Sequence, residues 1–406
     1  MKKLSLLLIF SCFILVNIAY WQDPWLWRRF FNTLGQIVAP TEHTILKPNE
    51  VIGPADAVFY LPINDDQRTI KQESIGHAID FVKQFDTYAF VVVHRGAIQA
   101  EWYADGWNKD SLTQSQSMHK SIVALLIGAA LESGKIDSIN DPIAKYIDEW
   151  EGDERGAITI HQLMIMSSGL EQYKFKLNPF TDDFKWLYSG NSIGPALRNP
   201  KAGWQPGEKF DYNNINAELL GLVIERSTGQ RYADYLREQL WQKMGGEEAL
   251  VWIDSENGDA FTSCCLMAKA VDWAKLGIMM LNEGEINGQR IVAKDWIRKM
   301  ITQSSVSPWY GLQTWLAYPT EINPRSRNPF NSGAYARTEE FLANDVYYFS
   351  GRGAQRVYVV PSHELVIVRL GPALGRNPLK PGWDNSFLVN TMIRGIQLVE
   401  ITNSEN

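Results

Sequence analysis

The chain has 406 residues and a mass of 46.2 kDa, which fits two or three domains, or one large fold with an insertion. Hydrophobic residues make up 45% and charged residues 21%, a globular composition that excludes a wholly disordered chain. The net charge of -7 argues against nucleic acid as a partner, because that ligand requires a concentrated basic face. Three Cys exclude a disulfide scaffold. Adjacent cysteines rarely bridge without strain, so we expect Cys264 and Cys265 to be two packed thiols.

The first 30 residues predict a targeting segment. Lys2 and Lys3 precede an apolar run from Leu4 to Tyr20, whose ~17 residues lie between a signal-peptide core and a full membrane span. No good small-residue cleavage site follows, and residues 20–29 combine aromatic and cationic side chains as an interfacial collar does. We expect an uncleaved anchor in the inner membrane with the body in the periplasm. A cleaved signal peptide is the close alternative, whereas the lysine start disfavours a buried core helix.

The next part of the chain predicts a lead-in, a hairpin and a buried helix. Residues 31–75 carry several prolines and no clear period, and we interpret them as a linker and lead-in. Strands are expected at 88–94 and 97–103, joined by a tight turn. Residues 121–132 are apolar nearly all round and are followed by Gly134, which is typical of a central buried helix and its end.

The remaining elements place a helical insertion between two parts of one sheet. Helical periods alternate with loops from about 140 to 260, including a helix at 217–227 that Thr228-Gly229 would end. Further helices are predicted at 268–281, 294–302 and 385–399, and strands at 347–350, 355–360 and 365–370. Strands at both ends with helices between predict an α/β domain over 76–400, whose sheet the C-terminal part completes.

The strongest local signal is Ser117-Met118-His119-Lys120, directly before the predicted central helix. Residues three apart on a helical turn face the same side, with Cβ atoms ~5–6 Å apart. The helix N-terminus and the apolar helix behind it disfavour an ammonium group, so Lys120 can act as a base near neutral pH. The N-terminal amides can help to hold a developing oxyanion. An N-capping serine with a solvated lysine is the alternative.

Two further patterns contain groups that such a nucleophile needs. In residues 206–214, Tyr212 beside a lysine can lose its proton below its usual pKa of ~10 and act as a general base, and Asn214 can donate to the lysine or to a substrate carbonyl. Residues 350–355, Ser-Gly-Arg-Gly-Ala-Gln, open a strand whose glycines permit close backbone approach and a second oxyanion amide. Taken alone, each pattern fits an ordinary turn equally well.

Other motifs carry less. Ser192 fits a Gly-x-Ser-x-Gly nucleophile elbow, the hallmark of an α/β-hydrolase, but no buried strand precedes it and Pro195 follows. We therefore expect a loop serine. The histidines share no ligand spacing and no phosphate-binding loop is present, so neither a metal nor a cofactor is expected.

The three patterns, in this order, resemble the penicillin-recognising serine hydrolases. The resemblance is to the class C β-lactamase-like branch, with its family VIII carboxylesterases, D-alanyl-D-alanine peptidases and 6-aminohexanoate-dimer hydrolases. Residues 159–170, 218–229 and 270–277 also match family stretches, so the resemblance covers roughly 85–395. It implies a β-lactamase/transpeptidase-like fold, a mainly antiparallel sheet flanked by helices with an all-helical subdomain.

The resemblance also implies roles for the catalytic residues. Ser117 would be the acyl-forming nucleophile, Lys120 its partner and Tyr212 the general base, with Asn214 the third member of a Tyr-x-Asn motif. An exported hydrolase that cleaves a small-molecule ester or amide through a Ser117 acyl-enzyme is the resulting hypothesis. The alternative is a non-catalytic or slow binding protein for a β-lactam or a cell-wall peptide.

The third motif departs from the family. Gly351-Arg352-Gly353 stands where the family has Lys/His-Thr/Gly-Gly, which would place Arg352 and Gly353 in the substrate site and make the Ala354 amide the second oxyanion donor. Without the usual lysine, the cationic grip on a substrate carboxylate is missing unless Arg352 or Arg356 replaces it. We therefore expect esterase or amidase activity rather than efficient β-lactam hydrolysis. Aromatic residues at 173–199 and 309–337 indicate an apolar acyl group, or equally core packing: Phe180, Phe184, Trp186, Trp309 and Trp315.

Overall fold

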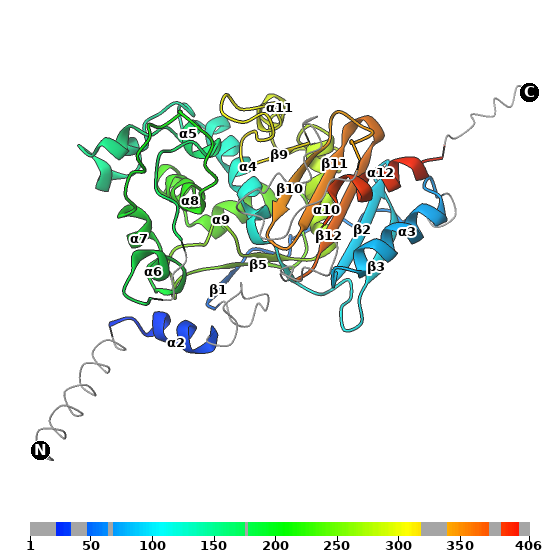
Figure 1. The fold of residues 1–406 in the computed structure, drawn as a ribbon, viewed down its shortest axis with the longest axis horizontal. Helices are drawn as coiled ribbons and strands as arrows, with labels where there is room; N and C mark the ends of the chain where they lie inside the picture. Colours follow the sequence, from blue (N-terminus) through cyan, green and yellow to red (C-terminus); the bar gives the residue numbers. More distant parts are fainter. Residues whose placement is uncertain are drawn as a thin grey trace, which may run out of the picture.

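The computed structural model describes residues 22–33, 47–63, 68–174, 178–317, 339–372 and 383–397. Figure 1 shows a helical lobe beside a layered lobe built on a sheet, with helix α4 (His119–Glu132) between them. The predicted membrane anchor, 4–20, lies outside the described residues. Among the helices that are described, none has the length and apolarity to cross a bilayer.

The main sheet is antiparallel, in the order β3-β2-β12-β11-β10-β9. Its inner strands are buried along their whole length because helices cover both faces, and this explains the unbroken apolar run Val91-Val92-Val93. The predicted hairpin and C-terminal strands, and the antiparallel sheet, are confirmed. The strands are β2 (Ala89–His94), β3 (Ala97–Tyr103), β9 (Trp315–Leu316), β10 (Tyr347–Gly351), β11 (Gln355–Val360) and β12 (Leu365–Leu370).

Two helical layers sandwich this sheet. Alternate side chains of β2 point to opposite faces: Phe90 and Val92 join the apolar cluster under α3 (Gln72–Lys83) and α12 (Asn385–Gly395). Val91 and Val93 join the larger core that contains α4 and α10 (Ala270–Leu281). Helix α11 (Lys294–Met300) packs on α4, where the Trp296 indole donates to the Ala124 carbonyl at 3.0 Å.

The other lobe is helical, as predicted for the insertion. Its longest helix, α8 (Asn214–Thr228), ends at Gly229, whose φ of +69° is the left-handed conformation that closes a helix at least cost to glycine. Eleven residues of α4 are buried, which confirms the central helix predicted from its apolar sequence. The shorter helices are α5 (Ile160–Met164), α6 (Asp182–Tyr188), α7 (Ile193–Leu197) and α9 (Tyr232–Leu236), followed by a π-helical turn (Arg237–Trp241).

A second, smaller sheet leads into the site and was not predicted. Its strands have two to four residues, too few for a period of two to be visible in the sequence. β1 lies in the range 31–75, where we expected no element. In the order β1-β5-β6-β4 the strands are β1 (Asn49–Val51), β5 (Ala249–Trp252), β6 (Leu266–Ala268) and β4 (Thr113–Gln114); β7 (Glu285–Ile286) and β8 (Gln289–Arg290) form a separate hairpin.

Helix α2 (Pro24–Thr33), which follows the predicted anchor, packs on the helical lobe (Figure 1). Its Leu26 joins Phe184 and Tyr188 of α6 in a small apolar cluster. The Arg29 guanidinium is buried and donates hydrogen bonds to five backbone carbonyls, those of residues 47, 188, 189, 253 and 254. Burial lowers the pKa of Arg29 to about 10, so it stays charged at neutral pH. The division of the chain at residue 30 stays a prediction.

Candidate active site

The short strand β4 and the N-terminus of α4 place the serine and lysine of the first motif. After β4 the chain makes one 3-10 turn (Gln116–Met118) and enters α4 at His119. Ser117 is half-buried at the helix N-terminus, and Lys120 follows on the first turn of α4. The Lys120 Nζ donates to the Ser117 Oγ at 3.0 Å. The two residues that the sequence paired are therefore in direct contact.

The surroundings of Lys120 favour its neutral form. It is only 1% exposed, and its Nζ also donates to the Ser263 carbonyl at 2.5 Å. Burial disfavours the ammonium form and lowers the pKa of Lys120 to about 7, against an opposing attraction to the Glu218 carboxylate. At neutral pH about half of the lysine is therefore neutral and able to accept a proton from Ser117.

Tyr212 lies across the nucleophile from α4, in the segment that leads into α8. Its ring centroid is 5.2 Å from the Lys120 Nζ, and its hydroxyl hydrogen-bonds with Ser117. Burial raises the pKa of Tyr212 above its ordinary value, and the bond to Ser117 and the charge of Arg356 offset this only in part. The expectation that a neighbouring lysine lowers this pKa is wrong, because burial outweighs the opposing effects of the Ser117 bond and the Arg356 charge. Tyr212 is therefore protonated in the resting site.

Asn214 is the first residue of α8 and is half-buried, while its neighbour Asn213 has the structural role at this helix end. The Asn213 side chain accepts from the Ile215 amide at 3.0 Å and donates to the Leu170 and Glu171 carbonyls. This cap fixes where α8 begins and so the position of Tyr212. The role of Asn214 towards substrate stays a prediction.

The β10–β11 hairpin brings the third motif against the nucleophile turn. A Cβ on Gly351 would lie 2.4 Å from the Ser115 carbonyl oxygen, so glycine is required for this close approach. In the turn, Gly353 and Ala354 have positive φ values of +83° and +62°, and Ala354 is buried. Gln355, which the sequence analysis passed over, ties the hairpin in place because its amide donates to the Gln114 and Gly371 carbonyls.

The two arginines of this motif differ. Arg352 is exposed in the turn. Arg356 is 2% exposed, and it donates to the Gly351 and Gln355 carbonyls and to the Asn385 Oδ1. The Arg356 guanidinium therefore holds the hairpin, and the idea that it replaces the missing lysine as the grip on a substrate carboxylate stays a prediction.

An aromatic wall, which we define as Phe210, Tyr212, Tyr310 and Trp315, stands beside the nucleophile. Trp315 on β9 is half-buried, and its ring lies 5.7 Å from Tyr212 and 5.0 Å from Tyr310. The other aromatic residues singled out in the sequence fall into a buried pair and an exposed pair. Phe184 and Trp186 are core residues of the helical lobe, whereas Phe180 and Trp309 are exposed.

A buried segment, Thr262–Leu266, holds the nucleophile turn from behind, and the sequence analysis missed it. The Ser263 carbonyl accepts from Lys120, the Cys264 carbonyl contacts the His119 Nδ1 at 2.5 Å, and the Leu266 carbonyl accepts from the Ser115 amide at 2.8 Å. Backbone acceptors leave no residue signature, which is why no motif revealed them.

Within this segment Cys264 and Cys265 are joined as a disulfide. The expectation of two packed thiols is therefore wrong. In extended chain, adjacent side chains point to opposite faces. Cys265, however, has a φ of +79°, outside the extended region.

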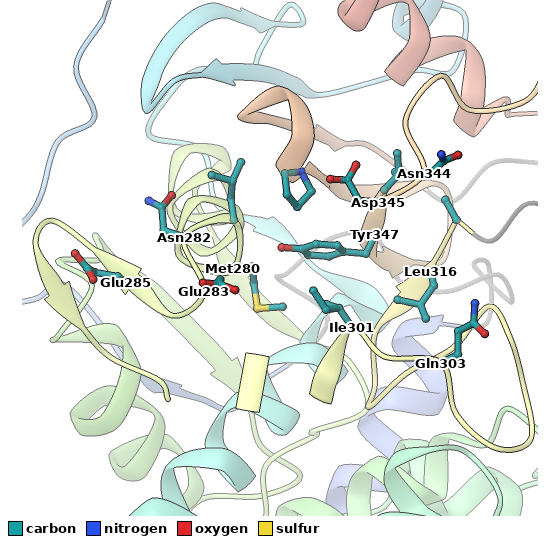
Figure 2. A pocket seen from close by; sticks show the side chains of 14 residues that line it. Met280, Asn282, Glu283, Glu285, Ile301, Gln303, Leu316, Asn344, Asp345 and Tyr347 are labelled. Atoms are coloured by element: carbon teal, nitrogen blue, oxygen red, sulfur yellow. The ribbon is translucent and has the colours of Figure 1, made fainter. Parts of the chain in front are cut away.

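The remaining motif and cavity lie elsewhere. Ser192 is fully buried before α7, and its hydroxyl donates to Asp254 at 3.1 Å, which is a structural contact. A cavity of about 810 Å³ opens at the Tyr347 end of β10, opposite the Gly351 end that contacts the nucleophile turn; Figure 2 shows Tyr347 within it. Of the carboxylates that line it, Glu283 is paired with Lys294 and Arg298, and Glu285 with Arg290. Over the described residues, no three His, Cys, Asp or Glu side chains are grouped to hold a metal.

Comparison with known proteins finds relatives among hydrolases and solved structures of the same fold. A 6-aminohexanoate-dimer hydrolase from Paenarthrobacter ureafaciens is 26% identical over 297 residues, which cover 70% of this chain and 72% of the relative. A Bacillus anthracis structure, described as that of a candidate 6-aminohexanoate-dimer hydrolase, superposes with a TM-score of 0.69 at 22% identity, covering 87% and 92% of the two chains. A family VIII carboxylesterase superposes with a TM-score of 0.58 at 15% identity, covering 80% and 98%.

The family model described as Beta-lactamase matches residues 77–383. This range holds the serine–lysine pair, the tyrosine, the hairpin and every strand of the main sheet. The fold is the β-lactamase/transpeptidase-like arrangement that the three motifs implied. The chain is thus a serine hydrolase that belongs to the beta-lactamase family.

Proposed function

We propose that the protein hydrolyses a carboxylic ester or amide through an acyl-enzyme on Ser117. The observation that carries the proposal is the 3.0 Å hydrogen bond between the Lys120 Nζ and the Ser117 Oγ, with the lysine buried and its pKa lowered to about 7. A serine is a weak nucleophile until an adjacent base accepts its proton. Lys120 can do this at neutral pH without any other group.

Acylation follows from this contact. Neutral Lys120 accepts the hydroxyl proton as the Ser117 Oγ attacks the substrate carbonyl carbon, and the carbonyl electron pair moves onto its oxygen. The Ser117 amide at the N-terminus of α4 and the Ala354 amide in the hairpin turn are the proposed donors to that oxyanion. Gly353 gives the turn its backbone freedom, since its φ is +83°.

Tyr212 completes the proton path. When the tetrahedral intermediate collapses, the bond to the alcohol or amine breaks and the leaving atom needs a proton. The Tyr212 hydroxyl, held against Ser117 and kept protonated by burial, donates it and takes the proton back from the Lys120 ammonium. Water then attacks the acyl carbon by the same steps, which restores Ser117. In this proposal Lys120, not Tyr212, is the first base.

The substrate class follows from what surrounds the nucleophile. The aromatic wall offers an apolar surface, and Arg356, the buried cation of the hairpin, is occupied by backbone carbonyls. We therefore propose an uncharged acyl group, with Asn214 and Arg352 at the rim as polar contacts. Esters and linear amides fit this better than a β-lactam, whose carboxylate needs a cation. Relatives named as a 6-aminohexanoate-dimer hydrolase and a carboxylesterase support both bond types.

Export is part of the proposal. The lysines at 2 and 3, the apolar run 4–20 and the aromatic and cationic collar support an N-terminal inner-membrane anchor with the hydrolase in the periplasm. Cell fractionation tests this. The full chain in the soluble cytoplasmic fraction, rather than in the membrane fraction and accessible to protease added from the periplasmic side, would contradict it.

The catalytic proposal is tested with a fluorophosphonate probe on the full chain in mild detergent, with the modified peptide identified by mass spectrometry. We expect an adduct on Ser117 that is absent from Ser117→Ala and at least ~100-fold slower to form in Lys120→Ala. Ser192→Ala, in which only a buried structural hydroxyl is lost, is the control and should label as the wild type does. A folded wild type without an adduct would support the binding-protein alternative, and an adduct on Ser192 would refute the assignment.

A further inference from the structure

A buried carboxylate faces the catalytic lysine, and neither the motifs nor the family roles account for it. Glu218 lies on α8, one turn after Asn214, and is 1% exposed. A carboxylate in such a place carries a high desolvation cost, and burial accordingly raises its pKa. Helix α8 packs against α4, which carries Lys120 (Figure 1).

The contacts of Glu218 lead directly to Lys120. The Glu218 Oε2 accepts from the Thr262 amide at 2.9 Å and from the Thr262 hydroxyl at 3.1 Å. The next residue is Ser263, whose carbonyl accepts from the Lys120 Nζ at 2.5 Å and whose side chain also hydrogen-bonds with the Glu218 carboxylate. The Glu218 carboxylate therefore holds the Thr262–Ser263 segment, and this segment holds Lys120.

We propose that Glu218 is the positioning residue of this site: it seats the Ser263 carbonyl that holds Lys120 towards Ser117, and it supplies the one negative charge that the lysine faces among the described residues. This rests on the proposed function, in which Lys120 is the base.

The surroundings of Lys120 support the electrostatic half of the proposal. On α4 itself, His119 is buried with its pKa lowered to about 4, so it is neutral at working pH. Tyr212 presents its ring, and its hydroxyl stays protonated. Ser263 offers Lys120 an uncharged carbonyl oxygen, and the charge of Arg356 on β11 lowers the pKa of Tyr212. Glu218 is the group whose charge raises the pKa of Lys120 and opposes the effect of burial.

The test separates charge from geometry. Glu218→Gln keeps the shape and an acceptor for the Thr262 amide but removes the charge, so the pKa of Lys120 must fall further. We expect the acidic limb of the pH profile for Ser117 acylation to move to lower pH, so that the ratio of the rate at pH 6 to that at pH 9 rises above the ratio of about 0.1 expected for the wild type from a Lys120 pKa of about 7. Glu218→Ala loses both functions, and a loss on the order of 10²-fold is expected from a lysine displaced by about 1 Å.

Glu225→Gln is the matched control. Glu225 lies on the same helix, burial raises its pKa to about 7, and its carboxylate accepts from the Tyr232 amide rather than from Thr262. This variant should leave the acidic limb in place. If it moves the limb instead, the limb belongs to Glu225 and the proposal is wrong.

Two further variants cover a Glu218→Gln protein that does not fold. Glu218→Asp keeps the charge but shortens the reach, so the limb should stay near its position while the plateau rate falls. Thr262→Val removes the hydroxyl bond and should also lower the plateau. The proposal is wrong if folded Glu218→Gln keeps the acidic limb of the wild-type pH profile. It is also wrong if Glu218→Asp and Thr262→Val both reach the wild-type plateau rate of acylation. A wild type that gives no Ser117 adduct at any pH would instead overturn the proposed function.

Discussion

Gly221, one turn after Glu218 on α8, offers a sharp test of how the lysine is held. Alanine is normally favoured over glycine inside a helix by roughly 0.5–1 kcal/mol. Here a Cβ would lie 2.5 Å from the Thr262 Cγ2 and 2.6 Å from its Oγ1, whereas carbon atoms in contact are ~3.5–4.0 Å apart. Thr262 must therefore retreat by about 1 Å.

Thr262 cannot escape by rotating its side chain. Its β-branched χ1 is stiff, and its hydroxyl donates to the Ala217 carbonyl and to Glu218. The backbone has to move, and Ser263 moves with it. Overpacking of this kind costs ~1–3 kcal/mol, so the gain in helix propensity leaves a net loss of stability of about 0–2.5 kcal/mol. A lysine anchor displaced by about 1 Å should lower kcat/KM on the order of 10²-fold.

The assay for Gly221→Ala is burst and steady-state hydrolysis of a chromogenic ester, with thermal unfolding measured on the same samples. Gly76→Ala is the matched control: it is also a mid-helix glycine, on α3, and its Cβ would meet no atom within 4 Å. We expect that control to gain ~0.4–1 kcal/mol of stability and to keep full activity. A folded Gly221→Ala enzyme with wild-type kinetics would refute the reasoning that Thr262 and Ser263 hold Lys120 in place.

Three other predictions follow from the site and its supports. The wild-type acylation rate should rise about tenfold per pH unit below pH 7 and level off above it, because only neutral Lys120 accepts the proton; stopped-flow measurement of the burst checks this, and a rate independent of pH from 5 to 9 would contradict it. Trp315→Ala should raise KM for esters of aromatic acids several-fold with kcat little changed, and equal loss for acetyl esters would argue against an acyl contact. Arg29→Ala leaves five buried carbonyls without their donor and should cost at least ~2 kcal/mol in thermal unfolding, whereas the exposed neighbour Arg28→Ala should cost less than ~0.5 kcal/mol.

Long periodic segments and short motifs could be predicted from the sequence. The apolar run that forms α4, the β-branched runs of β2 and β12, and the Thr228-Gly229 helix end each depend on local pattern, and each is confirmed. The Ser117–Lys120 contact was also predictable, because side chains three positions apart on a helical turn lie next to each other.

What could not be predicted depends on contacts between distant parts of the chain. The carbonyls of the Thr262–Leu266 segment support the nucleophile turn through backbone atoms that any residue possesses. Tyr212 was expected to have a pKa lowered by a neighbouring lysine, but burial, a property of the whole fold, decides the sign of the shift. One signal was visible: Glu218 is a charged residue in the otherwise apolar middle of α8, and buried charge of that kind marks a partner to be found.

The docking of α2 limits where this protein can be shortened. Arg29 links the α2 helix to residues 47, 188–189 and 253–254, three separate parts of the fold. A shortened chain that starts at residue 31 would lose that link, whereas one that starts at Gln22 would keep the helix whole. The alternative of a cleaved signal peptide carries the same limit: a cut that leaves α2 whole falls ahead of Pro24.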